Sequence, residues 1–199
     1  MRDMKSTPKE MSTEDKYKAL HRGGKYKVLK RDGSILIKTT GYGSGGGFKT
    51  VIKTIKKHVD QNPGTFLLDY GCGSAKIWHD KQMSLGNTTV VEYLGENLSG
   101  FYRYDPFHPK YDTRPENKFN LVVVAEVIEH LPLEEIPVLL KDIASLASDK
   151  IIFTIPQSPS NAYFMDGENM HCTLMSKDDW IKLIRKYIPK NTITIKYTP

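Results

Sequence analysis

Residues 66–73 read Phe66-Leu67-Leu68-Asp69-Tyr70-Gly71-Cys72-Gly73, a short apolar run that ends in a turn with two glycines. Such a turn, placed directly after a buried strand, lies at the carboxyl end of a sheet, where open α/β sheets bind their ligands. Gly71 and Gly73 have no Cβ, so the backbone can approach a ligand closely. Asp69 favours a cationic ligand. The dinucleotide fingerprint G-x-G-x-x-G is incomplete, because Lys76 stands where its third glycine would be.

From residue 65 onward the chain alternates strand-like and helix-like segments, which is typical of a parallel sheet covered by helices. Further strands are predicted at 101–104, 119–125, 151–155 and, as an edge strand, 192–197. The spacing of apolar residues predicts helices after Pro132 and after Ser176. Only 13 residues separate Asp105 from Phe119, too few for another strand and helix. We therefore predict a doubly wound, Rossmann-like, mostly parallel α/β sheet that is trimmed at one edge.

The N-terminal part carries the positive charge of the protein. Residues 1–60 contain 15 Lys and Arg against 6 Asp and Glu, whereas residues 61–199 contain 14 against 17. We therefore divide the chain into a basic N-terminal extension and cap (1–60) and a ligand-binding domain (61–199). Residues 1–24 are polar and are expected to form a mobile leader, with at most a short helix, that the fold does not need. A basic extension can attract nucleic acid or an acidic partner, although aromatic residues for base stacking are sparse in it.

Three local patterns follow this leader. Asp32-Gly33 lies between two β-rich runs and predicts a hairpin around it. Apolar residues at helical spacing over 51–59 predict a helix that Asn62-Pro63-Gly64 ends. Between them, residues 43–50 (GSGGGFKT) nearly match the phosphate-binding loop of nucleoside triphosphatases, but Phe48 replaces its second glycine and would block the backbone cradle. We interpret this glycine-rich segment as a flexible lid or a ligand-facing loop.

The composition limits the class of protein. No run of about 18 apolar residues is present, so we predict no membrane-spanning helix and no membrane partner. The N-terminus lacks the apolar segment of a secretory signal. Cys72 and Cys172 are the two cysteines and neither belongs to a C-x-x-C pair, so neither a disulfide scaffold nor an ordinary zinc site is expected. We expect a cytoplasmic protein whose oligomeric state the sequence leaves open.

Two motifs in the expected order carry a family resemblance. Residues 66–73 resemble motif I of the class I S-adenosylmethionine (SAM)-dependent methyltransferases. Residues 119–132 (FNLVVVAEVIEHLP) resemble the motif at the fourth strand of the same class. A narrower resemblance, to short methyltransferases of phage and bacteria, rests on Tyr104-Asp105-Pro106 and on residues 166–171 (DGENMH). The resemblance covers about residues 40–190 and implies SAM as the cofactor.

The resemblance also implies a role for each matching position. The backbone from Gly71 to Gly73 would hold the methionine moiety of SAM, with Asp69 near its ammonium group. Asp105 would bind the ribose hydroxyls, and Glu92 is a rival for that role. The implied cofactor-binding residues are Tyr42, Asp69, Gly71, Cys72, Gly73, Asp105, Pro106 and Glu126. Ala75 stands where motif I usually has a third glycine, and the missing strand leaves the adenine contacts undefined.

A cluster of acidic residues and histidines follows the fourth strand. We expect His171 and His130, together with Glu126, to be catalytic, because a histidine can act as a general base near neutral pH. A purely structural role for both histidines is the alternative. We predict no metal, since Glu-His-Leu at this place also occurs in methyltransferases that use none. The cluster nevertheless resembles the metal-binding set of the small-RNA 2′-O-methyltransferases, which leaves a divalent-ion site as the minority hypothesis, with the ligands Glu126, Glu129, His130 and His171.

The methyl acceptor is not identified by any of these patterns. The resemblance allows a small molecule, a nucleic acid or a protein side chain. The Asn-Pro-Pro-Tyr-type motif of amino-directed DNA methyltransferases is absent after the fourth strand, where residues 125–128 read AEVI, and this argues against methylation of base nitrogens. A hypothesis from a different class is a non-catalytic binding or structural subunit that keeps the cofactor fold.

Overall fold

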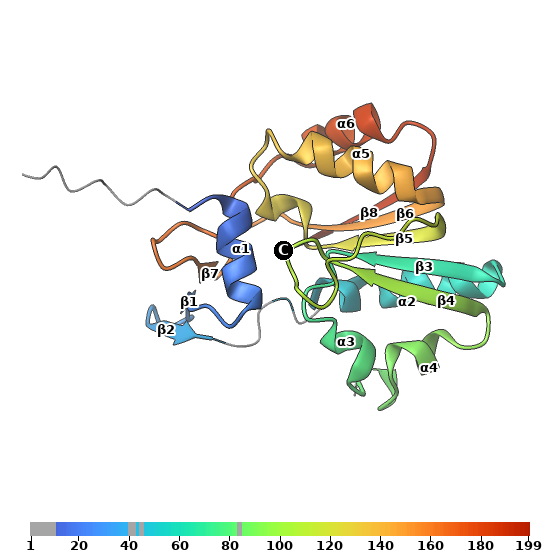
Figure 1. The fold of residues 1–199 in the computed structure, drawn as a ribbon, viewed down its shortest axis with the longest axis horizontal. Coiled ribbons are helices and arrows are strands. Elements are labelled where there is room, and N and C mark those ends of the chain that lie inside the picture. The colour runs from blue at the N-terminus through green and yellow to red at the C-terminus, as the bar shows by residue number, and fades with distance from the viewer. Residues whose placement is uncertain (1–10, 40–42, 44–45, 83–84) are drawn as a thin grey trace, which may run out of the picture.

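A five-stranded parallel sheet forms the centre of the molecule (Figure 1). The computed structural model describes residues 11–39, 43, 46–82 and 85–199. The strands lie in the order β4-β3-β5-β6-β8. Their bounds are β3 Thr65–Tyr70, β4 Leu98–Tyr104, β5 Phe119–Ala125, β6 Ala147–Pro156 and β8 Thr192–Thr198. In the described part of the chain β4 and β8 are the two edges, so the predicted doubly wound fold, trimmed beside β4, is confirmed.

Helices cover both faces of this sheet (Figure 1). On one face α5 (Ile136–Leu146) and α6 (Lys177–Tyr187) contribute Leu140, Ile143 and Trp180 to a core shared with β5 and β6. The other face is covered by α2 (Gly46–Gln61), α3 (Lys76–His79) and α4 (Val90–Leu94). Strand β5 is buried from Leu121 to Val124, which explains its continuous apolar sequence.

Helix α2 is amphipathic, and its apolar face packs on the sheet. Phe48, Val51, Ile55 and Val59 are buried at helical spacing, as the sequence predicts. The predicted division of the chain at residue 60 therefore falls at the end of a helix whose apolar face belongs to the central core. At 16 residues α2 is the longest helix, and none of the helices in the described segments is long and apolar enough to cross a bilayer.

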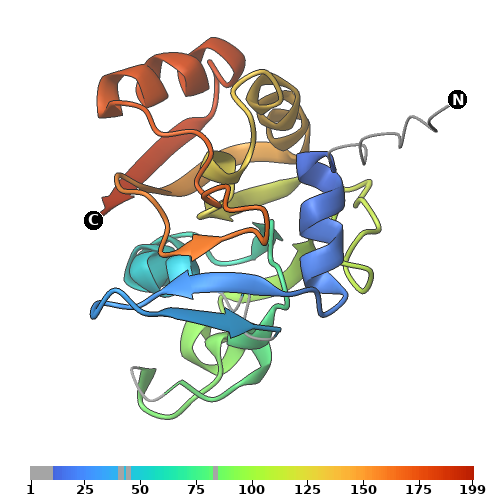
Figure 2. The ribbon, with the colours of Figure 1, turned by 90° about the vertical axis from the view of Figure 1, so that its left-hand side faces the viewer.

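A smaller cap lies beside the carboxyl ends of the central strands (Figures 1 and 2). It consists of α1 (Thr13–His21) and an antiparallel sheet in the order β2-β1-β7. Strands β1 (Tyr26–Leu29) and β2 (Ile35–Lys38) form the hairpin that Asp-Gly predicts, and β7 (Ala162–Tyr163) joins β1 from the distant C-terminal half. The cap is therefore assembled from both ends of the chain.

The expectation that residues 1–24 contribute nothing to the fold is wrong for α1. Ser12 caps the helix by accepting a hydrogen bond from the Asp15 amide at 3.1 Å. Tyr17 and Leu20 are buried in a third apolar cluster, with Tyr26, Phe164 and Met170. Two apolar side chains one turn apart were enough to bury one face of an otherwise polar helix, and composition alone does not reveal such a short pattern.

Charge pairs add to this packing. The Lys16 ammonium lies 2.7 Å from Asp166 Oδ2 and 2.5 Å from Glu168 Oε2, in the segment that follows β7. The acidic residues between 166 and 168 are thus partnered by the N-terminal helix. Helix α1 is bound to the C-terminal half of the chain both by apolar contact and by two ion pairs.

Candidate active site

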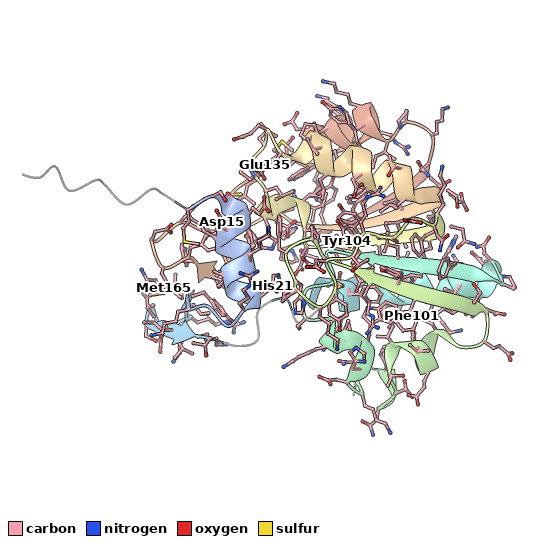
Figure 3. All side chains as sticks on the ribbon, in the orientation of Figure 1. Asp15, His21, Phe101, Tyr104, Glu135 and Met165 are labelled. Atoms are coloured by element: carbon pink, nitrogen blue, oxygen red, sulfur yellow. The ribbon has the colours of Figure 1, made fainter. Side chains whose placement is uncertain are left out.

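A cavity of about 330 Å³ lies between the carboxyl ends of the central strands and the cap. Seven of the eight predicted cofactor-binding residues line it: Asp69, Gly71, Cys72, Gly73, Asp105, Pro106 and Glu126. The eighth, Tyr42, lies outside the described residues, as does Ser44. The cap contributes Tyr17 and His21 to the wall, and sequence reasoning missed both of them. Figure 3 labels His21 at the end of α1 nearest the central strands.

The glycine turn after β3 needs its glycines for both conformation and space. Gly71 and Gly73 have positive φ values of 77° and 54°. A Cβ on Gly71 would lie 2.4 Å from Val127 Cγ2, and one on Gly73 would lie 2.5 Å from the Gly43 carbonyl oxygen. Ala75, at the place of the usual third glycine, also has a positive φ of 52°. The turn therefore keeps the backbone shape of a three-glycine motif with an alanine at its end.

Asp69 lies under this turn in a nearly closed environment. Its side chain is buried, and Oδ2 accepts a hydrogen bond from Trp78 Nε1 at 2.7 Å. Burial raises the pKa of Asp69 to about 7, although the Trp78 hydrogen bond opposes the rise. Trp78 in turn stacks on Phe101 with ring centroids 4.4 Å apart. Sequence patterns did not indicate this partner, because α3 has only four residues and is too short to show a period.

Asp105 connects the end of β4 to the glycine turn. Its Oδ2 accepts from the Gly73 amide and its Oδ1 from the Phe107 amide, both at 2.9 Å. His21 Nε2 lies 3.9 Å from Oδ2. The rival ribose ligand, Glu92, is exposed on α4 and closes the capping box with Thr89 instead. Of these two candidate ribose ligands, Asp105 lines the cavity and Glu92 does not, which argues against the Glu92 alternative.

Glu126 reaches the cavity from the first position after β5. It has a φ of 56°, which is uncommon for a residue with a side chain, and its amide donates to the Thr154 carbonyl at 3.1 Å. A Cβ on Gly47 would lie 2.7 Å from Glu126 Cδ, so the glycine at the start of α2 makes room for this side chain. Partial burial raises the pKa of Glu126. Gly47, the last glycine of the glycine-rich segment and part of the first turn of α2, thus accommodates Glu126.

His130 and His171 are oriented by backbone carbonyl groups. His130 Nδ1 lies 2.8 Å from both the Met170 carbonyl oxygen and the Tyr17 hydroxyl, and Tyr17 donates its own proton to Met170. His171 Nδ1 lies 2.8 Å from the Ser158 carbonyl oxygen. A carbonyl accepts only, so each neutral ring carries its proton on Nδ1 and its lone pair on Nε2. Burial lowers the pKa of both rings, that of His130 to about 4, which favours their neutral forms.

Glu129 faces both histidine rings, which themselves meet edge-to-face with centroids 5.0 Å apart. It is fully buried, and neither carboxyl oxygen has a hydrogen-bond partner among the described residues. Its Oε1 lies 3.7 Å from His130 Nε2 and 4.0 Å from His171 Nε2. Burial raises its pKa well above the ordinary value. Three acceptor atoms therefore converge at ligand spacing, and the donor set fits a divalent transition metal.

Glu126 is not part of that group. The ligand atoms that lie within 4.8 Å of one another belong to Glu129, His130 and His171 alone among the described residues. Of the four residues in the minority metal hypothesis, the fold brings three together and leaves Glu126 in the neighbouring wall of the cavity.

The fold and the site define the class of protein. A parallel sheet with a glycine turn after β3, an acidic residue at the end of β4 and a cavity between them is that of a class I SAM-dependent methyltransferase. Residues 48–187 match the family model described as a methyltransferase domain. The chain belongs to this methyltransferase family.

Three chains of solved structures match this chain. One of them is the crystal structure of magnesium protoporphyrin IX methyltransferase from Synechocystis PCC 6803 with bound SAM. The similarity covers 91% of this chain and 88% of that chain, with 15% sequence identity and a TM-score of 0.48. No curated protein sequence matches this chain significantly.

Proposed function

We propose that the protein transfers the methyl group of SAM to a hydroxyl group of its acceptor. The observation that supports a hydroxyl is the pair of neutral histidines with their Nε2 lone pairs in the cavity wall. A hydroxyl must lose its proton as it is methylated, and a neutral imidazole can take it. The acceptor itself, whether a small molecule, a nucleic acid or a protein, is left open by this proposal.

The proposed reaction is a single displacement. The acceptor oxygen forms a bond to the methyl carbon, the bond from that carbon to the sulfonium sulfur breaks, and S-adenosylhomocysteine leaves. The hydroxyl proton passes to His171 Nε2. The sulfonium is already activated, so alignment of the two reactants supplies much of the rate. His130 is the weaker base because its pKa is about 4.

For the cofactor, we propose the roles that the resemblance implies. The backbone from Gly71 to Gly73 would hold the methionine moiety, Asp69 the ammonium group and Asp105 the ribose hydroxyls. Each oxygen of Asp105 already accepts one backbone N–H, which leaves a second lone-pair position on each for a ribose hydroxyl. Glu126 would close the pocket from the β5 side.

Loss of either carboxylate is expected to weaken SAM binding. Asp69→Asn and Asp105→Ala should each cost roughly 1–3 kcal/mol, the scale of a hydrogen bond to a charged group. Calorimetric titration with SAM measures the effect. The matched control is Glu92→Ala, which removes an exposed carboxylate from α4 and should leave the affinity unchanged. Unchanged affinity in both site variants would remove the basis for these assignments.

The pH dependence of SAM binding tests Asp69 specifically. Because the pKa of Asp69 is about 7, most of the group is protonated at pH 6 and ionised at pH 7.5. A cationic ammonium group prefers the carboxylate, so affinity for SAM should rise about five- to tenfold over that interval. Asp69→Asn should flatten this rise. A rise of the same size in Asp69→Asn would assign the titration to another group.

Replacement of the proposed base separates catalysis from cofactor binding. His171→Ala should lower turnover by about 10²–10⁴-fold, the usual contribution of a general base, and leave SAM affinity unchanged. Release of S-adenosylhomocysteine in the presence of a panel of hydroxyl-bearing acceptors measures turnover. His58→Ala, on α2, is the matched control and should have no effect. Full turnover in His171→Ala would leave both histidines a structural role.

A second candidate role for the same cluster is metal binding. It is supported by the buried Glu129 carboxyl group, which lacks a hydrogen-bond partner in the described chain and faces both Nε2 atoms. Glu129, His130 and His171 would hold a divalent ion, which would polarise the acceptor oxygen. Calorimetry with Mn²⁺ and Zn²⁺ tests this directly. Glu129→Gln should abolish binding of the ion, whereas a metal-independent base predicts no binding and no effect of chelators.

The alternative from a different class is a SAM-binding subunit without turnover. It predicts calorimetric binding of SAM with no release of S-adenosylhomocysteine for any acceptor.

We further propose a cytoplasmic location, which the free cysteines Cys72 and Cys172 support, since free thiols are typical of a reducing compartment. The division into a cap (1–60) and a methyltransferase domain (61–199) is also a proposal.

A further inference from the structure

The hairpin of the cap exposes apolar side chains on both of its faces. In β2, Ile35 is 63% exposed, Leu36 40% and Ile37 54%. Neighbouring residues of a strand point to opposite sides, so neither face of β2 is covered by the rest of the described chain. Leu29, at the end of β1, is exposed as well. This arrangement differs from an ordinary edge strand, which has one apolar face turned inward.

The same hairpin is strongly basic. Its exposed cations surround the apolar residues at Lys25, Lys30, Arg31 and Lys38. Asp32 is its only acidic residue, and the carboxylate accepts hydrogen bonds from the Ser34 amide and hydroxyl. Asp166 and Glu168, just after Met165, share the single ammonium group of Lys16. Residues 25–38 carry five Lys and Arg against one Asp. The field around the hairpin is therefore positive.

Apolar surface continues beyond the hairpin on the same side of the cap. Met165 is 44% exposed, and its carbonyl oxygen accepts a hydrogen bond from Lys27 Nζ at 2.9 Å. Figure 3 labels Met165 beside β1 and β2, on the side of the cap away from the central sheet. We call residues 25–38 together with Met165 the hairpin surface.

We propose that the hairpin surface docks on an anionic lipid bilayer as a peripheral contact, contrary to the sequence-based expectation of no membrane partner, which considered spanning helices alone. Strand β2 is the outer strand of the cap sheet, so a bilayer that receives this edge can contact both faces of β2 at once, while its anionic headgroups pair with the flanking lysines and arginine. A single flat protein surface would cover one face and leave the other in water. The charge of the hairpin repels a second copy of itself.

Nucleic acid fits the surface less well. Stacking of bases requires exposed aromatic rings. Tyr26 is the aromatic residue of the hairpin, and it is buried inside the cap. The exposed side chains at the centre of the surface are aliphatic, which suits the acyl boundary of a membrane and not the face of a base.

The test is co-sedimentation of the full chain with phosphatidylcholine vesicles, with and without phosphatidylserine. We expect binding to the anionic vesicles and its loss at high salt. The double variant Ile35→Ser/Ile37→Ser should bind at least about tenfold more weakly, because about six buried carbon atoms are lost. Lys30→Glu/Arg31→Glu should also reduce binding at least about tenfold. The control Val138→Ser changes a residue that is 69% exposed on α5 and should bind as the native chain does.

Three results would overturn the proposal. One is equal binding of the native chain and the Ile35→Ser/Ile37→Ser variant to anionic vesicles. Another is tighter binding of the native chain to a single-stranded oligonucleotide than to the vesicles, lost in Lys30→Glu/Arg31→Glu. The third is a dimer in solution, measured by light scattering, that Ile35→Ser/Ile37→Ser converts to a monomer. Calorimetry with SAM shows in each variant that the cavity is intact.

Discussion

Removal of residues 1–24 is expected to lower the melting temperature of the protein by roughly 10 °C. Tyr17 and Leu20 are buried in the cap, and each buried apolar side chain contributes about 1.5–3 kcal/mol. In a chain of this size each kcal/mol corresponds to about 2–4 °C. The deletion also uncovers Phe164 and Met170 and removes the Tyr17 hydroxyl from His130. Thermal unfolding followed by circular dichroism measures the loss.

A pair of point variants distinguishes packing from a general effect of truncation. Leu20→Ala should cost about 2–4 kcal/mol, because it leaves a cavity inside the cap. Leu133→Ala removes the same atoms from a residue that is 51% exposed, and it should change the stability by less than about 0.5 kcal/mol. An unchanged melting temperature after removal of residues 1–24 would mean that the leader is dispensable, as its composition alone suggests.

Gly73→Ala is expected to weaken SAM binding roughly 100-fold with little change in secondary structure. A methyl group there would lie 2.5 Å from the Gly43 carbonyl oxygen and 2.9 Å from Gly43 Cα, both backbone atoms. The residue would also keep a positive φ of 54°, and strain of this kind costs about 1–3 kcal/mol. The turn must therefore move, and the amide that donates to Asp105 moves with it.

The control for this variant is Gly33→Ala. Gly33 has a positive φ of 81°, but nothing lies within 4 Å of a Cβ built on it. Both substitutions therefore carry a conformational cost, and only Gly73→Ala adds a collision at the cavity. Calorimetry with SAM should find native affinity in Gly33→Ala. Equal weakening in both variants would point to loss of stability and not to the geometry of the turn.

The central sheet was predictable because its signals are local and strong. The run from Leu121 to Val124 has no polar residue and is buried, so its sequence admits few alternatives to an inner parallel strand. The short distance from Asp105 to Phe119 correctly indicated the missing strand at the β4 edge. The alternation in residues 192–197 likewise identified β8 as an edge strand.

The cap was less predictable because its stability comes from contacts between distant segments. Helix α1 is polar except for its one buried side, and β7 has only two residues. Both belong to the cap, and no short window of sequence contains both. The short helices α3 and α4 were missed for a related reason, since four or five residues show no period.

In the site, too, some residues could be predicted from the sequence and others could not. Motif I and Asp105 could be located from the sequence because each directly follows a strand. The partners that control their chemistry could not, since Trp78 reaches Asp69 and Tyr17 reaches His130 through the fold. The metal hypothesis named four residues, and only three-dimensional placement separates Glu126 from Glu129, His130 and His171. Sequence spacing locates residues on elements, but it does not tell which side chains meet.

The cap is held together by contacts between segments that are synthesised far apart in time. The Tyr17 hydroxyl forms hydrogen bonds with His130 and with Met170, which lie 113 and 153 positions further along the chain. Lys16 pairs with Glu168, which is 152 positions away. On the ribosome, α1 emerges before these partners and lacks its docking surface until residues 130–171 have left the exit tunnel. Helix α1 is thus synthesised well before it can reach its native contacts, and nascent chains that end before residue 160 should leave Tyr17 and Leu20 accessible to chaperones and proteases.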